Sequence, residues 1–471
     1  MAKGSFTYAE LICLISDYME SNISGFHKLP LKRRLKLLKR FAQLSKDDVK
    51  ILTHNSALEM KTADAMIENV IGTTQLPIGI ATNFRINGKD HLIPMAIEET
   101  SVVAAASHAA KLVREGGGFA ASCDESVMIG QIQLMDIDNT QRAKKIILSK
   151  FNEIKNIVDN KDSIMVRLGG GVKDIEVREL DSHRGKIVVV HLLIDVKDAM
   201  GANAVNTYCE SVAPYLEKLT GGRSVLKIIS NLAIKRLARA SATWKKEIIG
   251  GDIVNGILDA YAFAKSDPFR AATHNKGIMN GIDSVLIATS NDWRAVEAGA
   301  HAYAAMNGSY GPLTRYEKNK RGDLVGHIEL PMAVGVVGGS TRIHPVSKVV
   351  LKILGVKSAK ELAEIAASVG LANNFAALHA MVKEGIRKGH MKLHATNIAA
   401  NAGAHGKEID IVAKVLVKED NITVSRAHEL LKEVRKQIRK RKLRRLIKKI
   451  ESKIERVRHK RKKLRKIRRK R

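Results

Sequence analysis

The segment from residue 125 to residue 231 carries the pattern that most restricts the fold of this chain. Strand-like alternation and helical periodicity follow one another there in the order β-α-β-β-α-β. This order predicts a split, ferredoxin-like domain, in which two βαβ halves interleave in one antiparallel sheet. The predicted strands are residues 127–137, 175–180, 186–195 and 225–230, and the predicted helices are residues 139–159 and 203–218.

The rest of the chain predicts a larger, mainly helical part. Ser45, followed by Asp48 three residues later, predicts the capped start of a helix. An Ala-rich helix is predicted over residues 94–115, and long helices alternate with Gly-rich loops after about residue 232. Hydrophobic residues make up 45% of the 471 residues, yet no run of 18 or more apolar residues occurs. We therefore expect a buried core and no membrane-spanning helix.

Charge is distributed unevenly along the chain. The net charge is +32, but residues 435–471 hold 23 Lys or Arg and two acids, which leaves +11 for the rest. The tail has one apolar stripe on a basic helical pattern. Three interpretations stay open: a coiled coil or docked helix, binding to RNA or the ribosome surface, and binding to an anionic membrane. The stripe comprises Leu443, Leu446, Ile450, Val457, Leu464 and Ile467.

The cysteines and the N-terminus indicate the compartment. Cys13, Cys123 and Cys209 are scattered and odd in number, so neither a disulfide framework nor a Cys-rich zinc site is expected. The first residues lack the order of a signal peptide. A reducing, cytoplasmic location is expected.

Two sequence features suit the binding of negative charge, and each also has an ordinary structural explanation. The strand over 186–195 runs through a turn containing Gly201 into a helix, where backbone N–H groups favour a pyrophosphate. An ordinary strand-to-helix turn has the same pattern. Lys276, between Asn275 and Gly277, suits a carbonyl oxygen or an oxyanion, and would otherwise be a surface lysine in a loop.

Three further features have structural explanations of the same kind. Glu99 falls at the expected start of the Ala-rich helix, where an acid usually interacts with the helix dipole. His390 and His394 are four residues apart and suit either a metal or a proton donor. No third ligand is evident, so no metal is expected. The residues around Asp292 give no sign of a chemical role, so a structural role is expected for it.

Together, however, these residues fall into five of seven ordered stretches, by which the chain resembles, over residues 25–434, the soluble class II form of 3-hydroxy-3-methylglutaryl-CoA (HMG-CoA) reductase. The stretches are Glu68–Gly72, Glu98–Ser107, Asp198–Asn206, Thr273–Gly281, Asn291–Gly299, Val337–Thr341 and Gly389–His394.

The resemblance implies a reaction and the residues that carry it. The family reduces HMG-CoA to mevalonate and CoA with two NAD(P)H, in the mevalonate pathway of isoprenoid biosynthesis. The resemblance implies that Lys276 stabilises the oxyanion, that Glu99 supplies a proton and that Asp292 orients both. His390 corresponds to the histidine that protonates the leaving thiolate. The implied substrate-binding residues are Arg270, Ser101 and Asn280.

A dinucleotide site without a Rossmann fold is also implied. Asp162 aligns with the acid that binds the adenosine ribose. A carboxylate there accepts a hydrogen bond from a 2′-hydroxyl and repels a 2′-phosphate, which favours NADH. NADPH stays possible because Lys161 and Arg167 are close in sequence. The other implied cofactor contacts are Asp198, Met200, Gly201, Asn203 and Asn231.

The resemblance further implies an α+β fold and homodimers, or higher oligomers of dimers, whose subunits share the active site. Thr100 and Thr396 replace a proline and an arginine that the family usually has, and the tail has no counterpart there. The implied parts are an HMG-CoA-binding domain (1–124 and 232–385), an NAD(P)-binding domain (125–231), a flap carrying His390 (386–434) and the tail (435–471).

The rival hypothesis is a nucleic-acid-binding protein built from the ferredoxin-like domain and the basic tail. An RNA-recognition sheet needs aromatic side chains on its central strand. The predicted strand over residues 186–195 has none, so the sequence favours the reductase.

Overall fold

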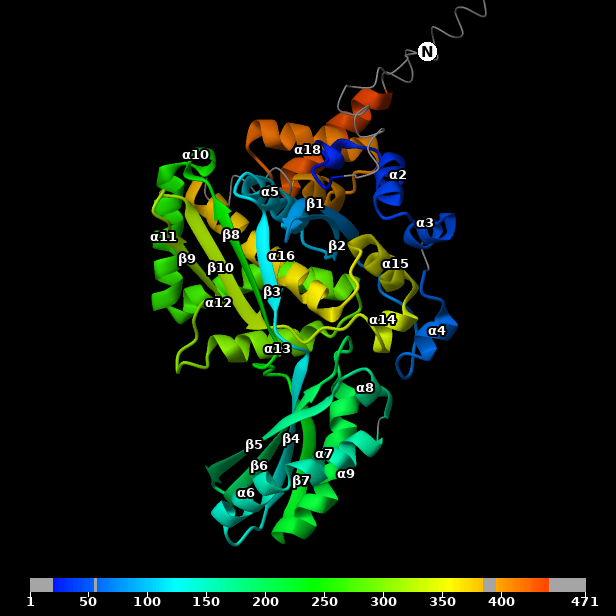
Figure 1. The fold of residues 1–471 in the computed structure, drawn as a ribbon. Helices are drawn as coiled ribbons and strands as arrows, with labels where there is room; N and C mark the ends of the chain where they lie inside the picture. Colours follow the sequence, from blue (N-terminus) through cyan, green and yellow to red (C-terminus); the bar gives the residue numbers. More distant parts are fainter. Residues whose placement is uncertain (1–19, 55–56, 162, 384–394, 440–471) are drawn as a thin grey trace, which may run out of the picture. The chain divides into compact units, whose positions relative to one another are not determined.

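The computed structural model describes residues 20–54, 57–161, 163–383 and 395–439 (Figure 1). Contacts divide the chain into two compact units, residues 1–383 and residues 384–471. Asp162, His390 and the tail beyond residue 439 lie outside the described residues.

The predicted ferredoxin-like domain is present in the first unit. Its antiparallel sheet has the order β5-β6-β4-β7, so the first strand of the domain lies between the third and the fourth. Ile132, Val190 and Leu216 are fully buried in a core that belongs to this domain. The domain comprises β4 (Val127–Met135), α6 (Thr140–Ser149), α7 (Phe151–Lys161), α8 (Ser163–Arg167), β5 (Gly171–Ser182), β6 (Gly185–Asp195), α9 (Ala202–Thr220) and β7 (Arg223–Ser230).

A six-stranded sheet with the order β2-β1-β3-β8-β10-β9 lies in the larger part of the first unit. The sequence did not predict it. In β8, for example, buried Ala238, Ala240 and Ala242 alternate with Arg239 and Ser241. Because alanine is small and not typical of strands, this alternation is a weak signal of a strand. The strands are β1 (Ile78–Ile86), β2 (Lys89–Ala96), β3 (Phe119–Cys123), β8 (Leu237–Trp244), β9 (Thr314–Lys318) and β10 (Leu324–Pro331).

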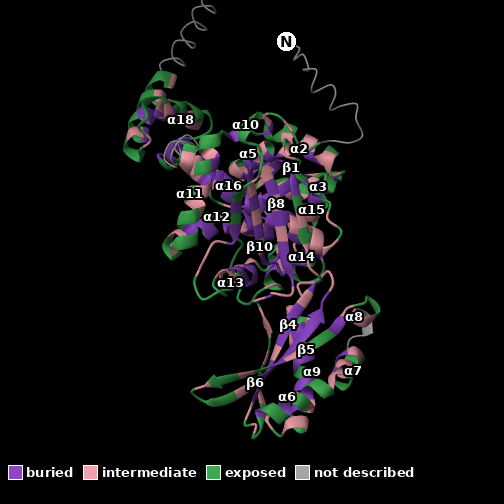
Figure 2. Cartoon of the chain, turned by 60° about the vertical axis from the view of Figure 1, so that its left-hand side comes forward, coloured by how far each residue is buried: buried purple, intermediate pink, exposed green. Residues whose placement is uncertain are grey.

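The long helix α16 (Ala359–Lys383) packs against this sheet, and both are largely buried (Figure 2). Phe375 of the helix stacks on Trp244 of β8 with a ring-centroid distance of 3.9 Å. Within the described part of the chain, α16 is long and apolar enough to cross a membrane. However, 78% of its most apolar window is buried inside the protein, as in the core helix of a globular domain.

The Ala-rich helix is shorter than predicted. Helix α5 is Val102–Arg114, and Pro94 belongs to β2. Because β2 is an edge strand of the sheet, a residue without an N–H is tolerated there. Glu99 therefore lies in the loop before the helix and not in its first turn, which corrects the prediction.

The Thr273–Gly281 stretch lies inside helix α12, so the alternative explanation of Lys276 as a surface lysine in a loop is wrong. Gly281 allows close packing there, since a Cβ would lie 2.6 Å from the amide nitrogen of Asn373. The other helices of the first unit are α2 (Leu31–Phe41), α3 (Lys46–Thr53), α4 (Met60–Asp64), α10 (Lys246–Ile249), α11 (Gly251–Ser266), α12 (Pro268–Ala288), α13 (Trp293–Ala304), α14 (Gly339–Ile343) and α15 (Pro345–Leu354), and a short 3-10 helix spans Phe26–Lys28.

The predicted helix start at Ser45 is confirmed. The Ser45 hydroxyl accepts a hydrogen bond from the Asp48 N–H at 3.0 Å, and the Asp48 carboxylate accepts one from the Ser45 N–H at 2.9 Å. This reciprocal capping box begins α3.

The second unit has its own small core. Helix α18 (Lys407–Glu419) places Leu416 in this core, together with Ala399 and Leu431. Arg435 forms an ion pair with Glu408 at 3.0 Å, which ties the end of the described chain to α18. Thr396 is exposed in this unit.

Candidate active site

Lys276 is held in place by its two neighbours on α12. His274 is buried, and its Nε2 lies 2.5 Å from the Thr314 hydroxyl. Asn275 is also buried; its side-chain oxygen accepts from the Leu313 N–H at 2.9 Å, and its amide donates to Gly311 O at 2.9 Å. Because both preceding side chains are fixed in the interior, the helix presents Lys276 to solvent in a defined direction.

Lys276 forms an ion pair with Glu99. Its Nζ lies 2.8 Å from Glu99 Oε2, and the Asn280 amide lies 3.5 Å from the same oxygen. The Lys276 and Glu99 side chains are 60% and 41% exposed. An exposed ion pair of this kind contributes only about 0–1 kcal/mol to stability. The pair therefore places an ammonium beside a carboxylate at the surface without being needed for the fold.

Ser101 adds a strained residue to the same loop. Its φ is +80° and its ψ is −25°, in the left-handed region, at the N-cap of α5. Its hydroxyl oxygen is buried and has no hydrogen-bond partner among the described residues. Strained backbone and an unsatisfied buried hydroxyl both cost free energy, and such costs concentrate at ligand sites. Thr100 precedes it, ahead of the helix and not at its start.

Arg270 lies on the same helix, six residues before Lys276. Asp267 caps this helix start by accepting from the Arg270 N–H at 3.1 Å. The guanidinium lies 3.9 Å from the sulfur of Met381 on α16, and burial lowers the pKa of Arg270. This cation is therefore partly desolvated, which strengthens its attraction for a carboxylate.

The predicted dinucleotide turn joins β6 to α9. Gly201 is the N-cap of α9 with a φ of +99°, and no side chain caps the helix. A Cβ on Gly201 would lie 2.6 Å from Val196, so the turn needs glycine. The uncapped N–H groups of a 19-residue helix suit a dinucleotide phosphate. Met200 is half-buried beside Gly201, and Asn203 is exposed in the first turn.

Asp198 also connects this turn to the large domain. Its Oδ1 accepts a hydrogen bond from the Ala359 N–H at the start of α16, at 2.8 Å, and its backbone oxygen accepts from the Val336 N–H at 2.9 Å. The residue thus ties the turn to the large domain. Asn231 follows β7, and its backbone oxygen would lie 2.3 Å from a Cβ on Gly299 of α13.

Among the described residues, Asp292 forms no hydrogen bond or ion pair with Lys276. It is the N-cap of α13, where its Oδ1 accepts from the Ala295 N–H at 3.1 Å and lies 3.5 Å from Arg294 Nη2. Lys276 lies twelve positions before Ala288, about 18 Å along the helix axis, and Asp292 follows the end of α12 after three loop residues.

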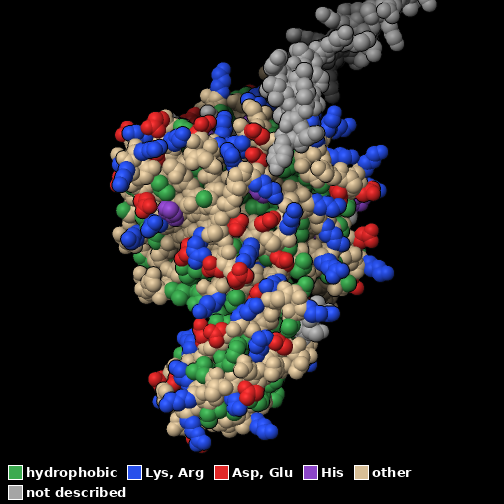
Figure 3. All heavy atoms as spheres, in the orientation of Figure 1, with side chains coloured by type: hydrophobic (Ala, Val, Ile, Leu, Met, Phe, Trp, Pro, Cys, Tyr) green, Lys and Arg blue, Asp and Glu red, His purple; other side chains and the backbone are tan. Residues whose placement is uncertain are grey.

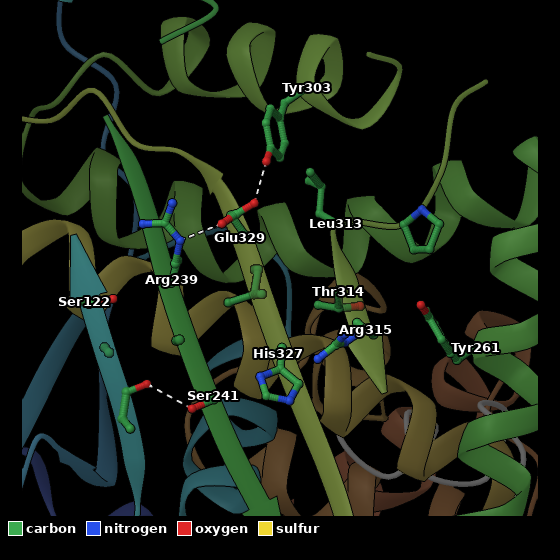
Figure 4. Close-up of a pocket in the computed structure, with 15 residues that line it drawn as sticks. Ser122, Arg239, Ser241, Tyr261, Tyr303, Leu313, Thr314, Arg315, His327 and Glu329 are labelled. Atoms are coloured by element: carbon green, nitrogen blue, oxygen red, sulfur yellow. Dashed lines mark hydrogen bonds and ion pairs between the residues drawn. The ribbon is translucent and has the colours of Figure 1, made fainter. Parts of the chain in front are cut away.

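The cavity on the outer face of the six-stranded sheet is separate from these residues (Figure 4). Its volume is about 730 Å³, and none of the predicted site residues lines it. Glu329 there accepts from the Tyr303 hydroxyl and from Arg239, each at 2.5 Å. Since Arg239 also pairs with Asp124 at 2.6 Å, these charges are mutually satisfied.

Comparison with known proteins identifies the family of this chain. The hydroxymethylglutaryl-coenzyme A reductase family matches residues 30–395. The 3-hydroxy-3-methylglutaryl-coenzyme A reductase of Archaeoglobus fulgidus is 57% identical over 418 residues, covering 88% of this chain and 95% of that protein. A probable reductase of Borreliella burgdorferi is 36% identical over 394 residues, covering 82% of this chain and 88% of that protein. The class II reductase from Streptococcus pneumoniae, bound to NADPH in open conformations, matches with a TM-score of 0.74 and 41% identity, covering 76% of this chain and 99% of that one.

The α+β fold, which includes a ferredoxin-like domain, and these similarities define an NAD(P)H-dependent oxidoreductase. The chain belongs to the hydroxymethylglutaryl-coenzyme A reductase family, in its class II form. Its activity is the NAD(P)H-dependent reduction of HMG-CoA to mevalonate and CoA. The nucleic-acid-binding alternative is not supported, and on the face shown in Figure 3 acidic side chains lie among the lysines and arginines.

Proposed function

We propose that Glu99, Lys276 and Asn280 form the reacting part of the HMG-CoA site, with Ser101 and Arg270 binding the free carboxylate of the substrate. The 2.8 Å contact between Lys276 and Glu99 carries this proposal. The unpartnered hydroxyl of Ser101 and the partly desolvated guanidinium of Arg270 suit a carboxylate.

The chemistry follows from what each group can hold or donate. A thioester carbonyl accepts hydride poorly, so the Lys276 ammonium stabilises the oxygen as it becomes negative. Glu99, once it has taken up a proton, delivers the proton that the product alcohol requires, and the carboxylate left behind is the form that pairs with Lys276. His390, outside the described residues, is proposed to protonate the departing CoA thiolate. When bound, the nicotinamide supplies the hydride.

Asp292 is proposed to serve the Lys276 of a second copy. Within the described part of one chain, Asp292 caps α13 and makes no hydrogen bond or ion pair with Lys276. In a symmetric dimer the same contact is made twice, so each chain gives Asp292 to its partner and receives one in return. This proposal makes the homodimer the smallest complete form of the enzyme.

The cofactor preference is proposed to be NADH, on the strength of Asp162, which lies outside the described residues. The Streptococcus pneumoniae relative was solved with NADPH, so the nicotinamide itself is common to both. Gly201 and the uncapped start of α9 are proposed to hold the pyrophosphate. Asp198, Met200, Asn203 and Asn231 are the further proposed contacts.

The domain boundaries, the location and the tail are also proposals. The small domain is placed at residues 125–231 and the flap at 386–434, close to the boundary between the two compact units at residue 384. A cytoplasmic location is proposed. For the tail, a truncation after residue 434 tests anchoring: the truncated enzyme should lose salt-dependent binding to RNA or anionic vesicles. If binding is unchanged, the remaining interpretation is that the tail forms a coiled coil or a helix docked on the body of the protein.

The decisive experiment follows the loss of reduced nicotinamide absorbance with HMG-CoA, using NADH and NADPH in parallel. Two NADH consumed for each CoA released, abolished in Lys276→Ala, is the expected result. A preference for NADPH would contradict the proposal that Asp162 selects NADH, and the other proposed site residues would be unaffected. Full activity of Lys276→Ala would reject the proposed site.

A further inference from the structure

Residues 333–337 connect β10 to α14 (Figure 1) and lie between the dinucleotide turn and the loop that carries Asp292. The turn lies on one side of this segment. A Cβ on Gly335 would lie only 2.6 Å from the Met200 backbone nitrogen. The Val336 N–H donates to Asp198 O at 2.9 Å. Any shift of the segment therefore moves the turn.

Asn291 clamps the segment from the other side. Its side-chain oxygen accepts from the Gly335 N–H at 2.7 Å, and its amide donates to Gly335 O at 3.1 Å. The residue is buried, with 9% of its surface exposed. A side-chain amide that satisfies both backbone groups of one residue fixes that residue in position and orientation, as a neighbouring strand would.

Arg236 holds the turn and the segment together directly. Its guanidinium donates to Ala199 O at 3.1 Å and to Val334 O at 2.5 Å. The side chain is 1% exposed, and burial lowers its pKa to about 10, so it stays charged at neutral pH. A buried cation is tolerated only with such partners, and removing one side leaves unsatisfied groups.

We propose that Asn291 and Arg236 are positioning residues for the nicotinamide cofactor: through residues 333–337 they fix the turn around Met200 at a set distance from Asp292. This inference rests on the proposed function, because it assumes that the turn binds the dinucleotide. Asn291 precedes Asp292, so one clamp sets the positions of both. Hydride transfer is sensitive to placement, and a misplacement of about 1 Å costs about a hundredfold in rate.

The test uses one amide variant and one steric probe. Asn291→Ala removes both hydrogen bonds to Gly335. Gly335→Ala leaves the clamp and pushes on Met200; this glycine has no positive φ, so the new methyl acts through its contact with the turn. Gly251→Ala is the matched control, because it also lacks a positive φ and nothing lies within 4 Å of its Cβ.

The measurements are the nucleotide dissociation constant from fluorescence titration of the full-length enzyme with NADH, and KM for both substrates. We expect Asn291→Ala and Gly335→Ala to weaken NADH binding about tenfold or more and to leave KM for HMG-CoA within about twofold. Gly251→Ala should match the wild type. Arg236→Lys keeps the charge but loses the second carbonyl contact. Its NADH dissociation constant should therefore lie between those of the wild type and of Asn291→Ala.

If Asn291 and Gly335 serve only the stability of the fold, the variants should have a lower melting temperature and a smaller active fraction. The NADH dissociation constant of the molecules that remain folded should then equal that of the wild type. That result in both Asn291→Ala and Gly335→Ala would overturn the proposal. It is distinguishable from failure of the proposed function, because that failure would appear as wild-type enzyme without turnover or as an active Lys276→Ala variant.

Discussion

Lys276 Nζ lies 2.8 Å from Glu99 Oε2, although 177 positions separate the two residues in the sequence. Glu99 comes from the loop between β2 and α5, and Lys276 from the middle of α12. Both side chains are largely open to solvent. An ion pair in that setting has little effect on folding, so its loss should change the chemistry more than the stability.

Replacing Lys276 by Ala should lower kcat by about 10²–10³, the usual effect of losing one group that stabilises an oxyanion. The free energy of unfolding should change by less than about 0.5 kcal/mol. Steady-state kinetics and urea unfolding measure the two effects. Lys150→Ala is a matched control, because it breaks an ion pair with Glu153 at similar exposure, 42% and 45%, in the small domain. Equal activity in the two variants would contradict the role of Lys276.

Ser101 should show opposite effects on stability and on substrate binding. Ser101→Gly relieves the left-handed backbone and should stabilise the fold by about 1 kcal/mol, while it removes the hydroxyl and raises KM for HMG-CoA. Ser101→Ala keeps the strain and removes only the hydroxyl, so it should raise KM without stabilising the fold. If both variants bind HMG-CoA as well as the wild type does, the hydroxyl has no role in the site.

Asp292 permits a complementation test of the shared site. Asp292→Asn keeps an N-cap residue on α13, so the variant should fold. Mixing inactive Asp292→Asn chains with inactive Lys276→Ala chains should restore about a quarter of wild-type activity. Half of the dimers are then mixed, and each mixed dimer has one intact site. If both residues acted within one chain, no dimer would hold an intact site and no activity would return.

The sequence was most informative where structure is local. The strand over 186–195, the Gly201 turn and the following helix are contiguous, and their pattern predicted the ferredoxin-like domain and the turn that begins α9. The six-stranded sheet was missed because its pairs join segments far apart, such as Phe119 with Ala242. Periodicity within one segment carries no information about such pairing.

The site was only partly predictable for the same reason. Glu99 was identified but placed on a helix, because Pro94 is as typical of a helix start as of an edge strand. The hydrogen bond between Asp198 and the start of α16 could not be predicted from the turn, because it joins residues 161 positions apart. Asn291 was passed over, since only the fold brings Gly335 against its side chain.

Asp283 should make the stability of the first unit depend on pH. Burial, with Glu297 beside it, raises the pKa of Asp283 from 3.8 to about 8, and its Oδ1 has no partner among the described residues. A carboxyl whose pKa is raised on folding binds its proton more tightly in the native state. Its contribution to stability is therefore complete below about pH 4, in the unfolded-state range, and is lost as the pH rises through about 8.

Asp283→Asn keeps the shape of the side chain and removes the titration. We expect the variant to be more stable than the wild type at pH 9 and to show a flatter dependence of the free energy of unfolding between pH 5 and pH 9, in urea unfolding at each pH. Asp138→Asn, on an exposed residue of the small domain, is the control and should follow the wild type. A variant curve parallel to that of the wild type across this range would show that Asp283 ionises freely in the folded protein, and the pH dependence would then have to come from another group.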